Sequence, residues 1–263
     1  FGSSADKVFK YMDKYPFVAG QFVWNGWDYL GEPTPYYSSR SSYSGMIDLA
    51  GFKKDRFYIY QSQWRPELPM VHILPHWNWQ GREGKTTPVH IFTSGDEVEL
   101  FVNGESKGRK KKGRFEYRLR FDDVIYAPGQ LKAVAYKDGK KWAEETVETT
   151  GEAAGLKITS DRNTIDADGK DLVFITVEVT DKQGRTVPKA ANEVTFSVEG
   201  KASIVATDNG DPTNFTPFPS VTRKAFSGKL LAIAKAEKGA TASFTVTATS
   251  NQGWTASTVI DVR

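Results

Sequence analysis

The pattern of apolar and polar positions divides the chain into three segments, of which the first covers residues 1–67. Within residues 5–14, Val8, Phe9 and Met12 recur at helical spacing. This spacing predicts a short amphipathic helix at the start of the chain.

An almost continuous apolar run, residues 17–24, follows that helix. Runs that are apolar on both faces are typical of strands in parallel sheets that helices cover. A loop rich in Gly, Pro and Tyr comes next, and residues 55–64 return to a helical pattern. One strand with two helices cannot bury both of its faces, so we expect its neighbours to come from upstream sequence or from another chain.

The second segment, residues 68–150, contains no helical stretch and alternates in the manner of strands. Turn signals at Asn103–Gly104, Pro128–Gly129 and Asp138–Gly139 punctuate it, and this spacing predicts a β-sandwich. The predicted strands are residues 71–74, 89–93, 97–102, 115–119 and 131–136.

The third segment, residues 151–263, begins within a stretch of small and polar residues at 148–155 that we interpret as a linker. The all-β pattern is repeated, and roughly seven short strands in about 110 residues predict an immunoglobulin-like sandwich. Its clearest predicted strands are residues 172–179, 193–198, 230–234 and 242–248.

Composition places the 263 residues among ordinary globular proteins, with 39% hydrophobic and 25% charged residues. A net charge of +3 is too small to indicate a nucleic-acid or membrane partner. The lack of Cys excludes disulfides, a thiolate nucleophile and Cys-ligated zinc. No stretch approaches the ~20 apolar residues of a membrane span. Because the first residues show neither an initiator Met nor a signal peptide, we expect a longer polypeptide upstream.

Three histidines invite a metal-site hypothesis, since His72, His76 and His90 lie close together in the sequence. His72 and His76 would share a helical face at that spacing, but Pro69 and Pro75 and the strand context exclude a helix. A packing or surface role is therefore favoured, and we expect no metal or other cofactor on this chain.

Two polar runs also have two interpretations each. The basic run at residues 109–114 suits a polyanion patch, but its position between strand-like segments favours a solvated hairpin or loop. Residues 208–211, Asp-Asn-Gly-Asp, resemble part of a calcium loop, but the segment after them lacks the distal Glu that such a loop needs. A turn between strands is favoured there, and a substrate-side loop is the other option.

The loop from Trp24 to Tyr37 carries the most informative chemistry, because it combines two Trp and several Tyr with an Asn, an Asp and a Glu. Sugars need this mixture, since their axial C–H groups stack on aromatic faces while their hydroxyls hydrogen-bond to amides and carboxylates. The loop also follows the C-terminal end of the predicted buried strand, the edge where barrels of alternating strands and helices build active sites.

The same loop carries a family resemblance. Residues 20–33, followed by 44–55 and 61–64, look like the last strand and closing helix of the catalytic barrel of glycoside hydrolase family 2. The resemblance continues into the second and third segments of the chain. The second resembles an accessory sandwich found in enzymes of gut Bacteroides-like bacteria, and the third resembles a final immunoglobulin-like domain. The stretches that resemble them are residues 76–79 and 99–104 for the first, and 208–211 and 226–229 for the second.

This resemblance implies a fold class. The chain is expected to be mainly β, with an incomplete C-terminal part of a (β/α)8 barrel followed by two immunoglobulin-like β-sandwich domains. The expected domain ranges are 1–67 for the end of the barrel, 68–150 for the accessory sandwich and 151–263 for the terminal one.

The resemblance also implies a retaining, β-galactosidase-like hydrolase that removes terminal β-linked sugars, with two Glu carboxyls about 5 to 5.5 Å apart. In the family both Glu come from earlier barrel strands, and no residue here matches either motif, so this chain alone is expected to be inactive. Its expected partners are a carbohydrate and the missing N-terminal part of the enzyme, and the expected location is the bacterial periplasm or exterior. One alternative is a carbohydrate-binding or adhesion module without hydrolytic activity. A third hypothesis makes the sandwiches spacers or contacts of a homo-oligomer.

Four residues are the candidates for substrate binding. By resemblance, Trp24 would form the hydrophobic wall of the subsite for the terminal sugar, unless it only closes the barrel. Asn25, Asp28 and Glu32 are candidates for binding hydroxyls. For Asp28 and Glu32 a structural role is equally favoured, in which the carboxylate caps a helix or pairs with Arg40 or Arg56. They are not expected to be a catalytic pair, because both lie on one loop.

Overall fold

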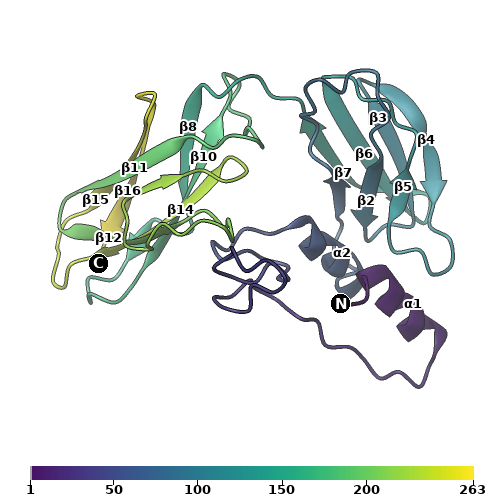
Figure 1. Cartoon of the computed structure of the whole chain (residues 1–263), viewed down its shortest axis with the longest axis horizontal. Helices are drawn as coiled ribbons and strands as arrows, with labels where there is room; N and C mark the ends of the chain where they lie inside the picture. Colours follow the sequence, from purple (N-terminus) through teal and green to yellow (C-terminus); the bar gives the residue numbers. More distant parts are fainter. Residues whose placement is uncertain (1) are drawn as a thin grey trace. The chain divides into compact units, whose positions relative to one another are not determined.

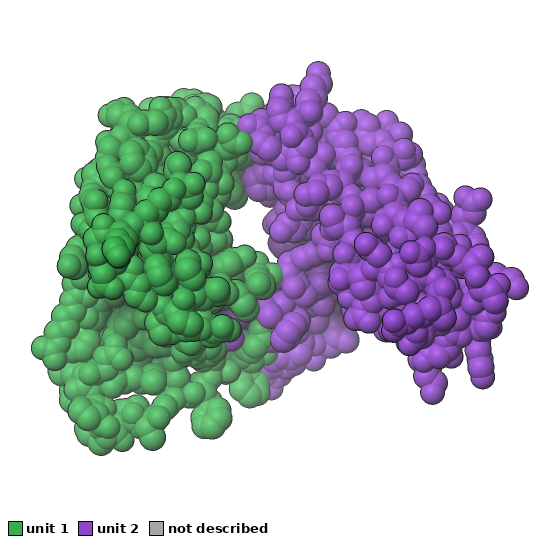
Figure 2. Space-filling model, turned by 180° about the vertical axis from the view of Figure 1, so that it is seen from behind, with its two compact units in different colours: residues 1–26, 53–149 green, residues 27–52, 150–263 purple. Residues whose placement is uncertain are grey.

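Strands dominate the structure, a computed structural model that describes residues 2–263, so the prediction of a mainly β chain is confirmed (Figure 1). The chain divides into two units (Figure 2). Unit 1 consists of residues 1–26 and 53–149, and unit 2 of residues 27–52 and 150–263. No helix among the described residues is long and apolar enough to cross a membrane.

Two helices lie in unit 1, and the sequence predicted both: α1 (Ala5–Lys14) and α2 (Asp55–Trp64). Ser4 caps α1 by accepting a hydrogen bond from a backbone amide of the first turn, one of the donors that a helix leaves unpaired. Phe9 is the buried residue of α1, and its ring centroid lies 5.6 Å from that of Tyr60 in α2. The amphipathic face of α1 therefore packs on α2.

Residues 17–24, which we call the aromatic ribbon, form neither a helix nor a strand, so the predicted buried strand is not found. Phe17, Phe22 and Trp24 are 82%, 106% and 72% exposed. A strand is stable where neighbouring strands pair its backbone groups, and none of residues 17–24 forms a bridge with any described residue. The barrel fragment expected for residues 1–67 is accordingly not observed.

The rest of unit 1 is a sandwich of two sheets around one core. The core cluster draws on both sheets and includes the fully buried Trp77. One sheet has the order β1-β2-β5, with β1 (Val71–Leu74), β2 (Val89–Thr93) and β5 (Leu119–Phe121). The other has the order β4-β3-β6-β7, with β3 (Glu97–Val102), β4 (Glu105–Lys111), β6 (Gln130–Lys137) and β7 (Lys140–Glu148).

Two turns of unit 1 lie where the sequence signalled them, and both prove to be hairpin turns. At Asn103–Gly104 the φ angles are 49° and 83°, and at Asp138–Gly139 they are 52° and 76°. Two-residue hairpin turns need such left-handed conformations, which Asn, Asp and Gly adopt most readily. The two turns connect β3 to β4 and β6 to β7.

Other strands of unit 1 differ from the prediction. The basic run falls in and after β4, an edge strand whose charged side chains deter further pairing, so the hairpin interpretation of residues 109–114 is confirmed. The strand predicted at residues 115–119 begins only at Leu119, because Phe115 has a left-handed φ of 66° that a strand does not admit.

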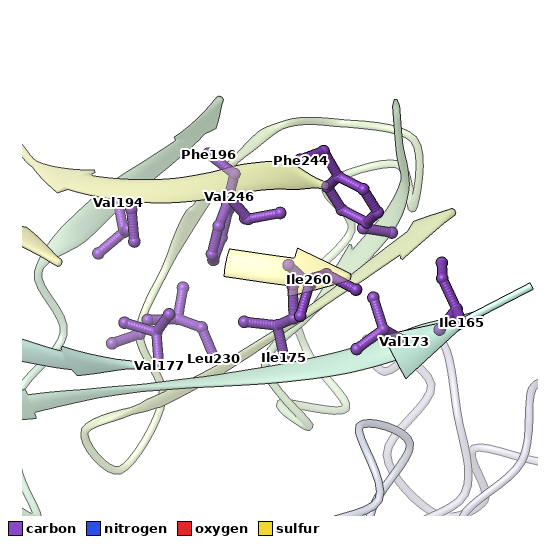
Figure 3. Close-up of a cluster of buried hydrophobic side chains, with 14 of the residues drawn as sticks. Ile165, Val173, Ile175, Val177, Val194, Phe196, Leu230, Phe244, Val246 and Ile260 are labelled. Atoms are coloured by element: carbon purple, nitrogen blue, oxygen red, sulfur yellow. The ribbon is translucent and has the colours of Figure 1, made fainter. Parts of the chain in front are cut away.

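Unit 2 contains a second sandwich. Figure 3 shows its core, in which the alternate residues Val173, Ile175 and Val177 of β10 face Phe196 and Val246 of the other sheet. One sheet has the order β12-β14-β10-β8, with β8 (Gly155–Ser160), β10 (Val173–Thr180), β12 (Ala202–Asp208) and β14 (Lys229–Ala236). The other has the order β13-β11-β15-β16-β9, with β9 (Thr164–Ile165), β11 (Glu193–Glu199), β13 (Thr222–Lys224), β15 (Phe244–Ser250) and β16 (Thr255–Val262).

Four strands of unit 2 lie where the apolar alternation predicted them, and five others were not predicted. The predicted ones are β10, β11, β14 and β15. Of the others, β9 and β13 have only two and three residues, too few to show an alternation, and β16 is rich in Thr and Ser.

Candidate functional site

Residues 27–52, which we call the docked loop, belong to unit 2 although they directly follow the aromatic ribbon. The loop folds back on itself, with an antiparallel bridge between Leu30 and Ser41 and a parallel bridge between Trp27 and Ile47. It contains most of the aromatic and acidic residues that the sequence marked as sugar-binding chemistry.

Asp28 holds the two arms of the docked loop together. Its side chain is buried, with 4% of the residue exposed, and its Oδ1 accepts a hydrogen bond of 2.7 Å from the backbone N of Gly45. The backbone N of Asp28 donates to the carbonyl O of Ile47 at 2.8 Å. A Cβ at position 45 would lie 2.2 Å from that same backbone N, so the close approach requires glycine.

Arg40 anchors the docked loop to the sandwich of unit 2. Its Nη2 lies 3.1 Å and 3.0 Å from the two carboxylate oxygens of Asp208, and both side chains are largely buried. The guanidinium also lies 4.6 Å from the centroid of the Phe218 ring, a cation–π distance. The backbone N of Arg40 donates to the carbonyl O of Pro212 at 2.9 Å. Arg40, which the sequence offered as a possible partner for Asp28 or Glu32, therefore pairs with Asp208.

The docked loop contacts the sandwich at the run Asp208–Asp211. Asp208 Oδ1 also accepts hydrogen bonds from the backbone N of Asn209 at 2.6 Å and of Gly210 at 3.0 Å. Gly210 has a φ of 77°, and a Cβ there would lie 2.1 Å from a carboxylate oxygen of Asp48 in the docked loop. Asp208 is the last residue of β12, and residues 209–211 begin the loop that leads to β13, so the run lies between strands as the sequence favoured. Gly210 leaves room for the docked loop at this point. Within residues 2–263 no cluster of His, Cys, Asp and Glu suits a metal ion.

Arg223 of β13 bonds to the segments on both sides of this run. It is 1% exposed, and burial lowers the pKa of its guanidinium. Its nitrogens donate to the side chains of Thr207 and Asn214 at 3.0 Å, and to the carbonyl oxygens of Thr216 and Pro217 at 3.2 Å and 3.0 Å. These bonds compensate for the lost hydration of a buried charge.

Glu32 lies at the exposed tip of the docked loop. Its carboxylate accepts a hydrogen bond from the hydroxyl of Tyr29. The residue has a φ of 43° and follows Gly31 with a φ of 89°, so two consecutive left-handed residues form the tip. Glu32 is thus an exposed residue on a tightly turned backbone.

Trp24 and Asn25 lie at the end of unit 1, joined by a cis peptide bond. The side chain of Trp24 is 72% exposed, and that of Asn25 is partly buried. The boundary between the units falls after Gly26, so the structure describes these two residues with unit 1, and Asp28 and Glu32 with unit 2. The four candidates are not brought together as one described site, and their sugar-binding roles stay predictions.

The histidines of unit 1 have packing partners. His72 donates through Nε2 to Asp55 Oδ1 at 2.8 Å, lies 3.5 Å from Glu145 Oε1 through Nδ1, and stacks on Tyr58 with ring centroids 3.8 Å apart. Burial by itself lowers the pKa of His72, but the bonds to the two carboxylates outweigh it and raise the pKa to about 9. His76 stacks on Trp79 at 4.5 Å.

Sequence reasoning missed the pairing of Arg40 with Asp208. The two residues are 168 positions apart, and one sequence offers no signal that joins charges at such a separation. The sequence placed the run 208–211 between strands. Its contact with the docked loop depends on the tertiary fold, so the sequence alone did not show it.

Comparisons with known proteins identify the family. The model of the glycoside hydrolase family 2 C-terminal domain 5 matches residues 156–259, and that of a domain of unknown function (DUF4982) matches residues 84–143. A beta-galactosidase of Bacteroides ovatus, BoGH2A, is 43% identical over 235 residues, which are 89% of this chain and 27% of that protein. A putative beta-glucuronidase of Formosa agariphila is 36% identical over 236 residues, 86% of this chain and 22% of that protein.

A crystal structure extends the likeness to the fold. It is that of a beta-glycosidase from Bacteroides vulgatus, with a TM-score of 0.93 and 34% identity over 98% of this chain and 33% of the other. The chain therefore belongs to glycoside hydrolase family 2, and it is similar to the C-terminal part of those proteins. It spans only about a quarter of the length of the two curated relatives, at 27% and 22%.

Proposed function

We propose that the chain is the C-terminal portion of a retaining, β-galactosidase-type glycosidase that removes terminal β-linked sugars from oligosaccharides or polysaccharides. The aromatic ribbon is the observation that carries the proposal. Phe17, Phe22 and Trp24 expose 82%, 106% and 72% of their surface to solvent. Contiguous apolar exposure of this kind marks a surface that another polypeptide covers. We assign that cover to the strands of a (β/α)8 barrel encoded upstream.

In the assembled barrel, Trp24 would lie at the C-terminal end of the last strand, where barrels build their active sites. Its exposed indole supplies a flat apolar wall for the terminal sugar, and Asn25 and Glu32 supply hydrogen bonds to hydroxyls. Asp28 contributes by position, because its carboxylate already fixes the docked loop through Gly45.

Hydrolysis then belongs to the assembled enzyme and not to this chain alone. A retaining glycosidase needs a nucleophile and an acid/base held on opposite sides of the glycosidic bond. Asp28 is buried in a structural contact, and Glu32 lies on the same loop, so neither fits such a pair. We further propose a periplasmic or extracellular location, where a bacterium meets polymeric glycans.

The test is reconstitution with the upstream polypeptide. Residues 1–263 alone should not hydrolyse p-nitrophenyl β-D-galactopyranoside, whereas the chain joined to the upstream barrel should. In that enzyme, Trp24→Ala should lower kcat/KM about tenfold, as expected for loss of one aromatic stacking surface. The p-nitrophenyl β-D-glucuronide, assayed in parallel, distinguishes the two activities named among the relatives.

Trp64→Ala is the matched control, because Trp64 is also about half exposed, at 49%, but lies on α2. Its kcat/KM should equal that of the wild type. An enzyme that stays inactive with the barrel attached, or one in which Trp24→Ala leaves kcat/KM unchanged, would contradict the proposal.

A further inference from the structure

A concave surface lies wholly within unit 2, on the outer face of the sheet β12-β14-β10-β8. It has a volume of about 550 Å³, within the range of small-molecule sites. Residues of β8, β10 and β14 line it together with Trp27 and residues 49–52 of the docked loop. We call it the loop groove.

Two aromatic side chains are exposed along the loop groove. On β10 the residues Ile175 and Val177 point into the core with no exposed surface, so Phe174 and Thr176 point outward. Phe174 is 40% exposed, and Trp27 is 56% exposed. Large rings that a fold leaves open in a concave surface offer stacking area to a ligand.

Hydroxyl groups lie beside the rings, since Thr159, Ser160 and Thr176 also line the groove. Among the described residues that line it, Asp161 is the one with a formal charge. Its carboxylate accepts from the backbone N of Phe174 at 2.8 Å and lies 3.1 Å from Nε of Arg162, so it is oriented and partly neutralised. This chemistry suits a neutral, hydroxyl-rich ligand and disfavours an anion.

The docked loop presents Trp27 on a fixed backbone. Trp27 is bridged to Ile47, and the next residue, Asp28, is held by Gly45. The pair of Arg40 and Asp208 ties the same loop to the sandwich. Because the loop is already ordered, a ligand that stacks on the indole loses little of its affinity to ordering the protein.

We propose that the loop groove is a binding site for a neutral oligosaccharide. One pyranose ring stacks on the indole of Trp27, the next lies along Phe174, and Thr159 and Thr176 exchange hydrogen bonds with sugar hydroxyls. The proposal concerns binding alone, so it can be tested independently of hydrolysis by the assembled enzyme.

Isothermal titration calorimetry on the 263-residue chain tests the site, with cellotetraose and β-1,4-galactotetraose as neutral probes and tetragalacturonate as the acidic one. A neutral tetrasaccharide should bind with a Kd of about 1 mM or below, and tetragalacturonate should bind more weakly. Trp27→Ala should weaken binding about tenfold. Thr176→Arg should abolish it by filling the groove from the outward face of β10 while leaving the loop intact.

Phe215→Ala is the matched control, because Phe215 is an exposed aromatic of unit 2, at 64%, that does not line the groove. Its Kd should equal that of the wild type, and circular dichroism verifies the fold of each variant. If Trp27→Ala disturbs the loop, Thr176→Arg decides. The proposal is overturned if neither neutral probe binds up to about 10 mM, or if a folded Thr176→Arg variant binds as tightly as the wild type.

Discussion

The aromatic ribbon and the docked loop are consecutive in the sequence, yet different things determine their conformations. In the ribbon, Phe22 is completely exposed, and its apolar pattern indicates a buried environment that residues 2–263 do not supply. In the docked loop, Asp28 is buried and Arg40 pairs with a residue of the terminal sandwich. A local pattern thus shows what surroundings a segment needs, and the tertiary fold decides whether they are present.

The largest expected effect comes from breaking the anchor of the docked loop. Asp208→Ala leaves the Arg40 guanidinium largely buried without its carboxylate and removes the acceptor of two backbone amides. Removing one partner of a buried ion pair costs about 3 kcal/mol or more, so we expect a loss of that size in the free energy of unfolding of unit 2. Urea unfolding measures it, and limited proteolysis should show new cleavage within residues 27–52.

Asp211→Ala is the control for that variant. Asp211 lies in the same loop, but among the described residues its carboxylate accepts hydrogen bonds only from the backbone N and the hydroxyl of Thr213. We expect a loss of about 1 kcal/mol or less, with the loop still protected. Equal losses in the two variants would mean that the Arg40 pair does not secure the loop.

The sequence predicted elements wherever the local pattern was enough. Both helices and the turns at Asn103–Gly104 and Asp138–Gly139 were found in this way, because helical spacing and left-handed turn residues are local properties. The edge strand β4 was not predicted as a strand, because its charged residues carry no apolar alternation. The sequence pointed to Asp28 as a candidate but not to its partner Gly45. Gly45 is needed because two backbones approach closely there, and nothing in the sequence distinguishes it from other glycines.

A smaller effect concerns His72, which ties α2 to the sandwich of unit 1 as Arg40 ties the docked loop to that of unit 2. With a folded pKa of about 9 and an unfolded value of about 6.5, His72 stabilises unit 1 fully below about pH 6.5. The stabilisation decreases as the pH rises and is lost above about pH 9. We expect His72→Gln to remove about 2 kcal/mol of pH-dependent unfolding free energy between about pH 6 and about pH 10, measured by urea unfolding.

The opposite sign is expected for His90, whose pKa is lowered by burial and by the charge of Arg118. Protonation of His90 destabilises the fold, so His90→Gln should differ from the wild type chiefly below about pH 6.5.

The His72 prediction has its own contradicting outcome. If the unfolding free energies of the wild type and of His72→Gln depend on pH in the same way above about pH 6.5, the Asp55–His72–Glu145 contact does not stabilise unit 1.

The smallest effect is expected in the aromatic ribbon itself. Because Phe22 is 106% exposed, Phe22→Ser removes no packing from this chain and should change the unfolding free energy by less than about 0.5 kcal/mol. The buried Phe9 of α1, at 5% exposure, is the contrasting aromatic, and Phe9→Ala should cost several times more than Phe22→Ser. If Phe22→Ser instead costs more than about 1 kcal/mol, the ribbon packs within the chain in solution. Its exposed rings would then no longer indicate a missing barrel.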